Sequence, residues 1–393
     1  MKQDTLSKAK AAKNDEFYTQ YYDIEREVEA YLEYDANVFR DKTMLLPCDD
    51  PEWSNFTRYF AQNFQRLGLK KLISTSYAIE SKKVKFPTQL SLFETEAPQF
   101  DPTKTQTHGK IFVLDRDVTG DGRIDINDLQ WNYLEYDGDF RSKEVTHLRD
   151  EADIIVTNPP FSLFREFLAW VLEADKNFLL IGNQNAITYK EVFPLIKANK
   201  IWLGVTMDSS NRWFQIPDNS IVFHKEENGK KYAFVANPVW FTNLEHGRRH
   251  QPLELMTMAD NIKYSRHKEV RGHDYVQYDN YDAIEVPKVD AIPSDYDGMM
   301  GVPISFLRKY CPEQFEIVGI TKTWARGAKK TYPEQVQVSS GKRQNVSKLN
   351  DGAAIEIYAP IEGTYYIVDD KFYTQVYARV LIRRIPPTTT QTK

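Results

Sequence analysis

The chain has 393 residues, of which 41% are hydrophobic and 27% are charged. This composition is typical of a soluble globular protein, and the length suits two or three domains. The formal net charge of −5 excludes a protein coated in positive charge. It does not exclude a nucleic-acid partner, because binding needs only a local basic surface.

Cysteine usage and the N-terminus indicate the compartment. The two cysteines, Cys48 and Cys311, form no CxxC pair, which argues against a disulfide framework or a zinc site and favours a reducing environment. The N-terminus lacks the apolar segment of a signal peptide, and no apolar run is long enough to span a membrane. We therefore expect a cytoplasmic protein without membrane association.

The first half of the chain alternates segments of helical and of strand character. Strands are expected at residues 43–47, 71–75, 111–114, 152–157, 178–181 and 201–205, and helices at 4–34, 53–67, 162–174 and 188–200. Residues 81–110 are rich in Pro, Thr and Gln and predict a long surface excursion. The alternation predicts an α/β fold in which a mostly parallel sheet is flanked by crossover helices.

The pattern changes after about residue 205, where strand-like segments follow one another. The turn Glu226-Glu227-Asn228-Gly229 is suited to close a hairpin. We predict a first domain over residues 1–240, with an excursion at 81–135, and a β-rich region over 241–385. The tail 386–393 is expected to be disordered.

The most informative segment is Asn158-Pro159-Pro160-Phe161, between an apolar strand and an amphipathic helix. Ligands of open α/β sheets bind at the carboxyl ends of strands, where this loop is expected. The prolines fix φ and lack N–H groups, so that carbonyl groups are available to a ligand. The alternative is a rigid strand-to-helix turn without a catalytic role.

These four residues suit methylation of the N6 amine of adenine. The Asn158 side-chain oxygen and the Pro159 carbonyl are placed to accept the two N6–H groups, which favours a pyramidal nitrogen whose lone pair attacks the methyl group. Phe161 offers a flat surface for the base. Because a base inside a duplex cannot reach such a pocket, it must be flipped out.

Longer segments resemble the EcoRI-type family of adenine-specific DNA methyltransferases. They are EADIIVTNPPFSLFREF, FLLIGNQNAITYKEVFPLIKANKIWLG, DEFYTQ at 15–20, LLPCDDPEWSNF at 45–56, GDFRS at 138–142, GVPISFL and QFEIVGIT. The resemblance implies a Rossmann-like methyltransferase fold, S-adenosylmethionine as methyl donor and N6 of adenine in duplex DNA as target. It also implies either a restriction-modification enzyme with a cognate restriction endonuclease, or an orphan enzyme.

The resemblance also implies which residues bind the cofactor. They are Tyr18, Thr19, Pro47, Cys48, Asp49, Asp50, Asp139, Phe140 and Asn158. The loop after the first strand contains the Cys48-Asp49-Asp50 run where most such enzymes have glycines. Each position has a structural alternative: a tyrosine packed in the core, a packed cysteine, acids at a helix N-terminus, or a Gly-Asp turn. The ligand of the ribose stays open among Ser74, Thr75, Ser76 and Glu80.

The segment 117–128 has the spacing of an EF-hand calcium loop, with glycine at its sixth position. The ligands would be Asp117, Thr119, Asp121, Asp125 and Asp128. DLQWNYLEY would then form the exiting helix, and the calcium would be structural. The alternative is a Gly-Asp-Gly turn that joins surface segments.

Basic residues gather in two later segments. They are Lys322, Arg326, Lys329, Lys330, Lys342 and Arg343 in one segment, and Arg248 and Arg249 in the other. We expect them to contact DNA phosphates, so that the C-terminal region recognises the target. The alternatives are a solvated basic loop and a structural turn.

Two other functions remain open from the sequence. The same loop is compatible with methylation of RNA or of a protein glutamine, since each presents a planar conjugated amine. The calcium-type loop is compatible with a non-catalytic calcium-binding interaction protein.

Overall fold

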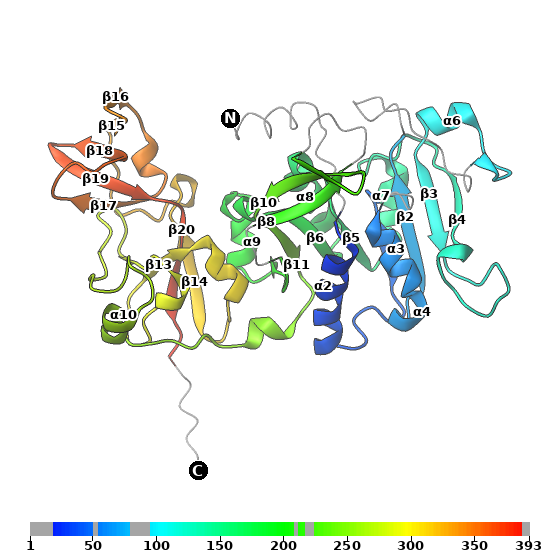
Figure 1. Cartoon of the computed structure of the whole chain (residues 1–393), viewed down its shortest axis with the longest axis horizontal. Coiled ribbons are helices and arrows are strands. Elements are labelled where there is room, and N and C mark those ends of the chain that lie inside the picture. The colour runs from blue at the N-terminus through cyan, green and yellow to red at the C-terminus, as the bar shows by residue number, and fades with distance from the viewer. Residues whose placement is uncertain (1–18, 50–53, 79–94, 208–210, 217–223, 387–393) are drawn as a thin grey trace, which may run out of the picture. The chain divides into compact units, whose positions relative to one another are not determined.

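The computed structural model describes residues 19–49, 54–78, 95–207, 211–216 and 224–386. The chain forms two compact units (Figure 1). The first unit comprises residues 1–183 and 201–247, and the second comprises 184–200 and 248–393. The sequence suggested a single boundary near residue 240. The two units differ from this division because the segment 184–200 belongs to the second unit. No helix in the described part of the chain is long and apolar enough to cross a membrane.

An eight-stranded sheet organises the first unit, in the order β4-β3-β2-β1-β5-β6-β11-β7. Its strands are β1 (Thr43–Leu46), β2 (Lys71–Ser76), β3 (Lys110–Leu114), β4 (Gln130–Tyr133), β5 (Ile154–Thr157), β6 (Asn177–Asn183), β7 (Trp202–Leu203) and β11 (Pro238–Thr242). Parallel pairing within this sheet is confined to β2, β1, β5 and β6. The four outer pairings are antiparallel. The expectation of a mostly parallel sheet is thus corrected to a mixed sheet with a parallel centre.

Helices cover both faces of this sheet. They are α2 (Tyr21–Tyr34), α3 (Asn55–Gln62), α4 (Phe64–Leu67), α6 (Pro102–Thr107), α7 (Lys143–Glu151) and α8 (Phe164–Glu173), with 3-10 turns η1 (Ile126–Asp128) and η2 (Phe161–Leu163). The 3-10 turn η4 (Gly247–His250) begins at the last residue of this unit. Ser54 caps α3 and Ser142 caps α7, because each side chain accepts a backbone N–H of the first turn. The helices expected at 53–67 and 162–174 are therefore present, the former divided in two.

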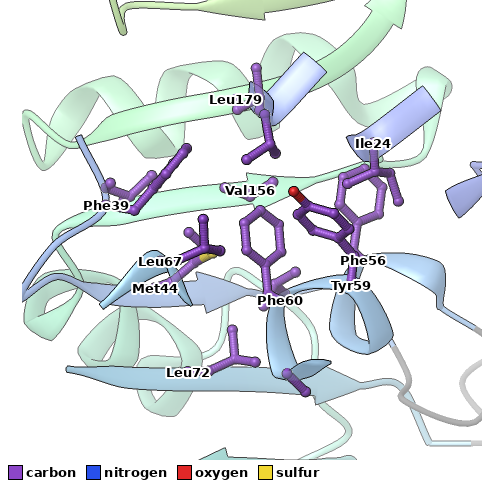
Figure 2. Packing of buried hydrophobic residues seen from close by; sticks show 14 of the residues in the cluster. Ile24, Phe39, Met44, Phe56, Tyr59, Phe60, Leu67, Leu72, Val156 and Leu179 are labelled. Atoms are coloured by element: carbon purple, nitrogen blue, oxygen red, sulfur yellow. The ribbon is translucent and has the colours of Figure 1, made fainter. Parts of the chain in front are cut away.

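Side chains alternate between the two faces of the sheet along each strand, so hydrophobic residues pack on both faces. Met44 of β1 and Val156 of β5 pack with α3 residues such as Phe60 in one cluster (Figure 2). On the opposite face, the Phe164 ring of α8 lies 5.0 Å from that of Phe241. The four residues of β5 are all buried, as a continuous apolar run in a central strand requires.

A small three-stranded sheet is inserted between β7 and β11. Its order is β8-β10-β9, with β8 (Asn211–Ile216), β9 (Lys225–Glu227) and β10 (Lys230–Ala236). The predicted hairpin turn is confirmed, since Asn228 and Gly229 have φ values of 52° and 74° between paired strands β9 and β10. Phe214 of β8 is buried and belongs to the core of the first unit.

The second unit is rich in strands, as predicted. It has a four-stranded sheet, β12-β13-β20-β14, and a five-stranded sheet, β16-β15-β18-β19-β17. The strands are β12 (Ile284–Glu285), β13 (Met300–Pro303), β14 (Phe315–Ile320), β15 (Val336–Ser339), β16 (Lys342–Asn345), β17 (Ala353–Ile357), β18 (Thr364–Val368), β19 (Lys371–Val376) and β20 (Arg379–Arg384). The helical segments are α9 (Phe193–Lys197), α10 (Met258–Tyr264), η3 (Gln184–Thr188), η5 (Val289–Ala291), η6 (Ile304–Lys309), η7 (Thr323–Ala325) and η8 (Lys348–Asn350).

Candidate active site

The candidate site lies at the carboxyl edge of the parallel strands. β1 has β2 on one side and β5 on the other, so the order of the strands reverses at β1. In open α/β sheets ligands bind outside the carboxyl ends of the strands at such a reversal. The loops that follow Leu46 and Thr157 flank this point.

The loop Asn158-Pro159-Pro160-Phe161 leaves β5 and enters α8 through η2. Pro159 is buried and the other three residues are half-buried. The Pro160 carbonyl accepts the N–H of Leu163 at 2.9 Å and so begins the turn. Sequence reasoning placed these residues after a central strand, and the structure confirms that placement.

The side chain of Asn158 is oriented by Thr19. Its Nδ2 donates to Thr19 Oγ1 at 3.5 Å, which directs Oδ1 away from Thr19. Thr19 is buried, and its carbonyl accepts the Nδ2 of Asn55 at the start of α3 at 2.8 Å. The structure thus brings Thr19 and Asn158 together from opposite ends of the first unit's sequence. Tyr18, the other residue expected here, lies outside the described residues.

Asp49 is a buried carboxylate in the loop after β1, and hydroxyl groups surround it. Its Oδ2 accepts from Thr157 Oγ1 at 2.6 Å and its Oδ1 accepts from Ser54 Oγ at 2.7 Å. Its carbonyl accepts from the hydroxyls of Thr57 and Ser74. Asp49 therefore links neighbouring strands. This structural role was not expected from the sequence, which suggested only a contact with the cofactor. Asp50 lies outside the described residues.

The other residues of this loop are less polar. Pro47 is buried, and Cys48 is half-buried and forms no disulfide within the described residues. Cys48 lies near the Tyr77 hydroxyl, whose pKa burial raises well above its ordinary value.

Asp139 follows the tight glycine Gly138 and forms the centre of a polar cluster. Arg141 donates to the Asp139 carboxylate through Nε at 2.9 Å and Nη2 at 2.6 Å, and the Tyr77 hydroxyl donates to it as well. Burial alone would raise the pKa of Asp139, but the hydrogen bonds from Arg141 outweigh it and leave the pKa below its ordinary value. Arg141 also pairs with Glu166 of α8 at 3.1 Å. The cluster therefore connects the Asp139 loop to α8, the helix that follows the Asn158 loop.

Two glycine positions explain how this loop approaches β2. Gly138 has a φ of 84°, and a Cβ at Gly138 or at Gly109 would collide with the Ser76 carbonyl. Phe140 turns the other way: it is 1% exposed, and its ring lies 5.0 Å from that of Phe167 and 5.5 Å from that of Trp170. This position is that of a core residue, so we assign Phe140 no direct contact with a ligand.

Sequence reasoning missed Thr157, Tyr77 and Ser54. Thr157 ends the apolar strand immediately before Asn158. A polar residue at that position could have been recognised from the sequence as part of the site. Tyr77 stands just beyond β2, where an acid was sought for the ribose. Among the residues considered for the ribose, Ser74 is engaged with Asp49 and Glu80 lies outside the described residues.

The EF-hand-like segment is not a calcium site. The expected exiting helix is instead the strand β4, which pairs with β3. Asp128 Oδ1 accepts the N–H groups of Val118 and Thr119, and its Oδ2 accepts that of Asp125. Backbone hydrogen bonds, first from Thr119, lower the pKa of Asp128 to about 2.

The other proposed ligands act in the same way. Asp117 accepts from the N–H groups of Gly120 and Gly122, and Asp121 accepts from that of Arg123. The carboxylates stabilise a hairpin turn rather than surround an ion. Within the described residues there is no group of three or more His, Cys, Asp or Glu side chains that could hold a metal ion.

The basic residues of the second unit differ in their exposure and in their ion pairs. Arg326, Lys329, Lys330, Lys342 and Arg343 are exposed. Lys322 and Lys330 form ion pairs with Asp351 and Asp279, respectively.

The second basic segment corrects one expectation. Arg249 is 4% exposed and donates to Asn199 Oδ1 at 2.6 Å, so it has a structural position and not one open to phosphates. Arg248 is half-buried.

Known proteins resemble this chain over most of its length. A protein-family model described as adenine-specific methyltransferase EcoRI matches residues 5–384. The Type II methyltransferase M.EcoRI of Escherichia coli is 44% identical over 321 residues, which cover 81% of this chain and 89% of that protein. No solved structure matches the chain.

Two mycoplasma proteins are also similar. The Type II methyltransferase M.MgeORF184P of Mycoplasma genitalium is 36% identical over 80% of this chain and 85% of its own length. The Type II methyltransferase M.MpnI of Mycoplasma pneumoniae is 35% identical over 80% of this chain and 84% of its own length. With a family match that spans nearly the whole chain, this protein belongs to the EcoRI family of adenine-specific DNA methyltransferases.

Proposed function

We propose that this enzyme methylates N6 of an adenine flipped out of duplex DNA, with Asn158-Pro159-Pro160-Phe161 as its catalytic loop. The observation that carries the proposal is the position of Asn158 at the carboxyl end of β5, with Nδ2 turned to Thr19. The parallel centre of the sheet and its reversal at β1 support a Rossmann-like methyltransferase fold.

The family implies S-adenosylmethionine as the methyl donor, and the residues at the carboxyl edge fit this cofactor. Gln20 Nε2 is buried beside Thr19 and has no hydrogen-bond partner among the described residues, so it offers a donor for a carboxylate or hydroxyl. Asp139 offers an ionised acceptor for an exocyclic amine. We assign the methionine end to the loops at Thr19 and Cys48-Asp49, and the adenine end to Asp139 and Tyr77.

The protein's contribution to the reaction is positioning and hydrogen bonding. When bound, S-adenosylmethionine supplies an electrophilic methyl group, whose C–S bond breaks as the N6 lone pair forms the new C–N bond. Asn158 Oδ1 and the Pro159 carbonyl accept the two N6–H groups, and this interaction strengthens as the nitrogen becomes positively charged. The same two oxygens hold the surplus proton until water accepts it.

Phe161 supplies a surface for the flipped base. Its ring is half-buried at the start of η2 and packs partly against the core of the first unit. An aromatic ring at this place offers a flat surface on which a flipped base can stack.

The second unit is the candidate for target recognition. It carries exposed cations in the loop that follows η7 and on the edge strand β16. Cations at such positions contribute phosphate contacts and thereby fix the register of the duplex. The relatives are Type II methyltransferases, a class that implies a restriction endonuclease of the same specificity as a biological partner.

The direct test is methyl transfer from labelled S-adenosylmethionine to duplex DNA, RNA and protein in parallel. We expect label only in duplex DNA, as N6-methyladenine, and we expect Asn158→Ala to abolish it nearly completely while binding of S-adenosylhomocysteine persists. Label in RNA or protein but not in DNA would reject the proposed substrate. Near-full activity of the Asn158 variant would reject the role of the loop.

A further inference from the structure

A buried hydrogen bond joins the loop after β1 to the end of β5 at the place where these strands separate. Their ladder ends at the pair Leu45–Ile155. Beyond that pair, Thr157 Oγ1 donates to Asp49 Oδ2 at 2.6 Å, across 108 positions of sequence. Thr157 is 0% exposed and Asp49 is 5% exposed. A charge-assisted bond of this length, shielded from water, is among the stronger polar contacts in proteins.

Asp49 is held firmly on its other sides. Its N–H donates to the Thr75 carbonyl at 3.1 Å, and its carbonyl accepts from Thr57 Oγ1 at 3.1 Å. Its second carboxylate oxygen accepts from Ser54, the cap of α3. Asp49 is thus fixed to β2 and α3, and the bond to Thr157 is its connection to β5.

The opposite end of the same two strands has a bond of the same kind. The N–H of Thr43 donates to Asp153 Oδ2 at 2.7 Å, and the N–H of Asp153 donates to the Thr43 carbonyl at 2.8 Å. That carboxylate therefore clamps β1 to β5 at the amino edge, away from the candidate site. The strand pair is clamped at both ends, but only the clamp at Thr157 adjoins the catalytic loop.

We propose that Thr157 is a positioning residue, which fixes Asn158 relative to the cofactor loop through its bond to Asp49. This inference rests on the proposed function of the Asn158 loop. The hydroxyl bond sets the rotamer of Thr157 and ties the end of β5 to the loop after β1, while pairing with Leu180 of β6 holds the backbone of Thr157. Since the strands have no ladder beyond Leu45–Ile155, this bond replaces the backbone pairing that would otherwise set their separation.

The expected consequence is a loss of turnover without a loss of cofactor binding. Methyl transfer requires the attacking nitrogen and the methyl group to be aligned closely, and a misplacement of about 1 Å can lower the rate about 100-fold. Thr157 touches neither the base nor the cofactor in this scheme. Asp49 keeps its bonds to Ser54, Thr57 and Thr75 when the Thr157 hydroxyl is removed, so the removal should act mainly on the alignment of Asn158.

The test compares Thr157→Val with Thr157→Ser in the full-length enzyme. Valine keeps the shape of threonine but removes the donor, whereas serine keeps the donor. We expect valine to lower kcat about 10- to 100-fold at saturating cofactor and DNA, and serine to retain most of the activity. The affinity for S-adenosylhomocysteine, measured by calorimetry, should change less than about threefold in both variants.

Asp153→Asn is the matched control, because it weakens the clamp at the far end of the same strands. It should lower the melting temperature and leave kcat near that of the unchanged enzyme. The inference is overturned if the folded valine variant turns over normally, if serine is as impaired as valine, or if Asp153→Asn lowers kcat equally. Failure of the unchanged enzyme to methylate DNA would instead reject the proposed function itself.

Discussion

Asn158 Nδ2 and Thr19 Oγ1 lie 3.5 Å apart, although 139 positions separate the two residues in the sequence. A primary amide that donates through its nitrogen presents its oxygen in the opposite direction. Thr19 is in turn held by Asn55 of α3, so the start of that helix helps to fix the residue that Asn158 contacts.

We predict that Thr19→Val lowers turnover about 10-fold, because the Asn158 amide loses the acceptor that orients its nitrogen. Thr19→Ser keeps the hydroxyl and should stay close to the unchanged enzyme. The measurement is kcat for methyl transfer at saturating DNA. Equal turnover of the valine and serine variants would contradict the orienting role.

We predict that Phe161→Ala weakens capture of the flipped base, since the stacking surface is lost. Stacking on an aromatic ring contributes about 1–3 kcal/mol per base, which corresponds to roughly 5- to 150-fold in affinity. The measurement is the fluorescence of 2-aminopurine at the target position, which should increase less on binding to the variant than to the unchanged enzyme.

Phe161→Tyr is the control for this prediction, because it retains an aromatic face. Since the Phe161 ring also packs partly against the core, melting of each variant should be compared first. A full fluorescence increase with the folded alanine variant would show that the ring does not hold the base.

We predict that replacing Lys342 and Arg343 by alanine flattens the salt dependence of DNA binding. Both residues are exposed on β16, and each phosphate contact contributes about 0.9 to the slope of log K against log salt. The loss of both should therefore reduce the slope by about 2.

Lys322→Ala is the comparison, because Lys322 is paired with Asp351 and only partly exposed. We expect it to change the slope less than the double variant does. An unchanged slope in the double variant would show that β16 is not part of the DNA-binding surface.

We predict that the hairpin turn closed by Asp128 loses stability in strong acid. The folded pKa of Asp128 is about 2, below its ordinary value of 3.8. Because the folded value is the lower one, the stabilisation is fully present above about pH 3.8 and is lost as the pH falls through about 2.

The measurement is amide hydrogen exchange at Val118, Thr119 and Asp125, whose N–H groups Asp128 accepts. Asp128→Asn should abolish the protection of these three amides from exchange that the carboxylate provides, at all pH values. Asp115→Asn, which changes an exposed aspartate near the turn, should leave that protection unchanged. Calcium should leave the protection unchanged. Protection that persists in Asp128→Asn would contradict the capping role.

The sequence by itself determined the central strands of the sheet and the place of the Asn158 loop at a strand end. A continuous apolar run predicts β5, because a strand buried on both faces needs apolar side chains at every position. The proline pair that follows must end the strand, since neither residue has an N–H to continue the ladder. These local constraints located Asn158-Pro159-Pro160-Phe161 at a strand end, and longer segments of the chain carried the family resemblance.

Tertiary structure alone decided which distant residues meet. The bonds of Asp49 to Thr157 and of Thr19 to Asn158 depend on the order of the strands, which local patterns do not encode. The same holds for the EF-hand-like segment: its spacing suits calcium, but pairing of β4 with β3 converts it into a hairpin turn. Local propensity specifies what each segment can form, and burial against distant partners selects which of those forms is realised.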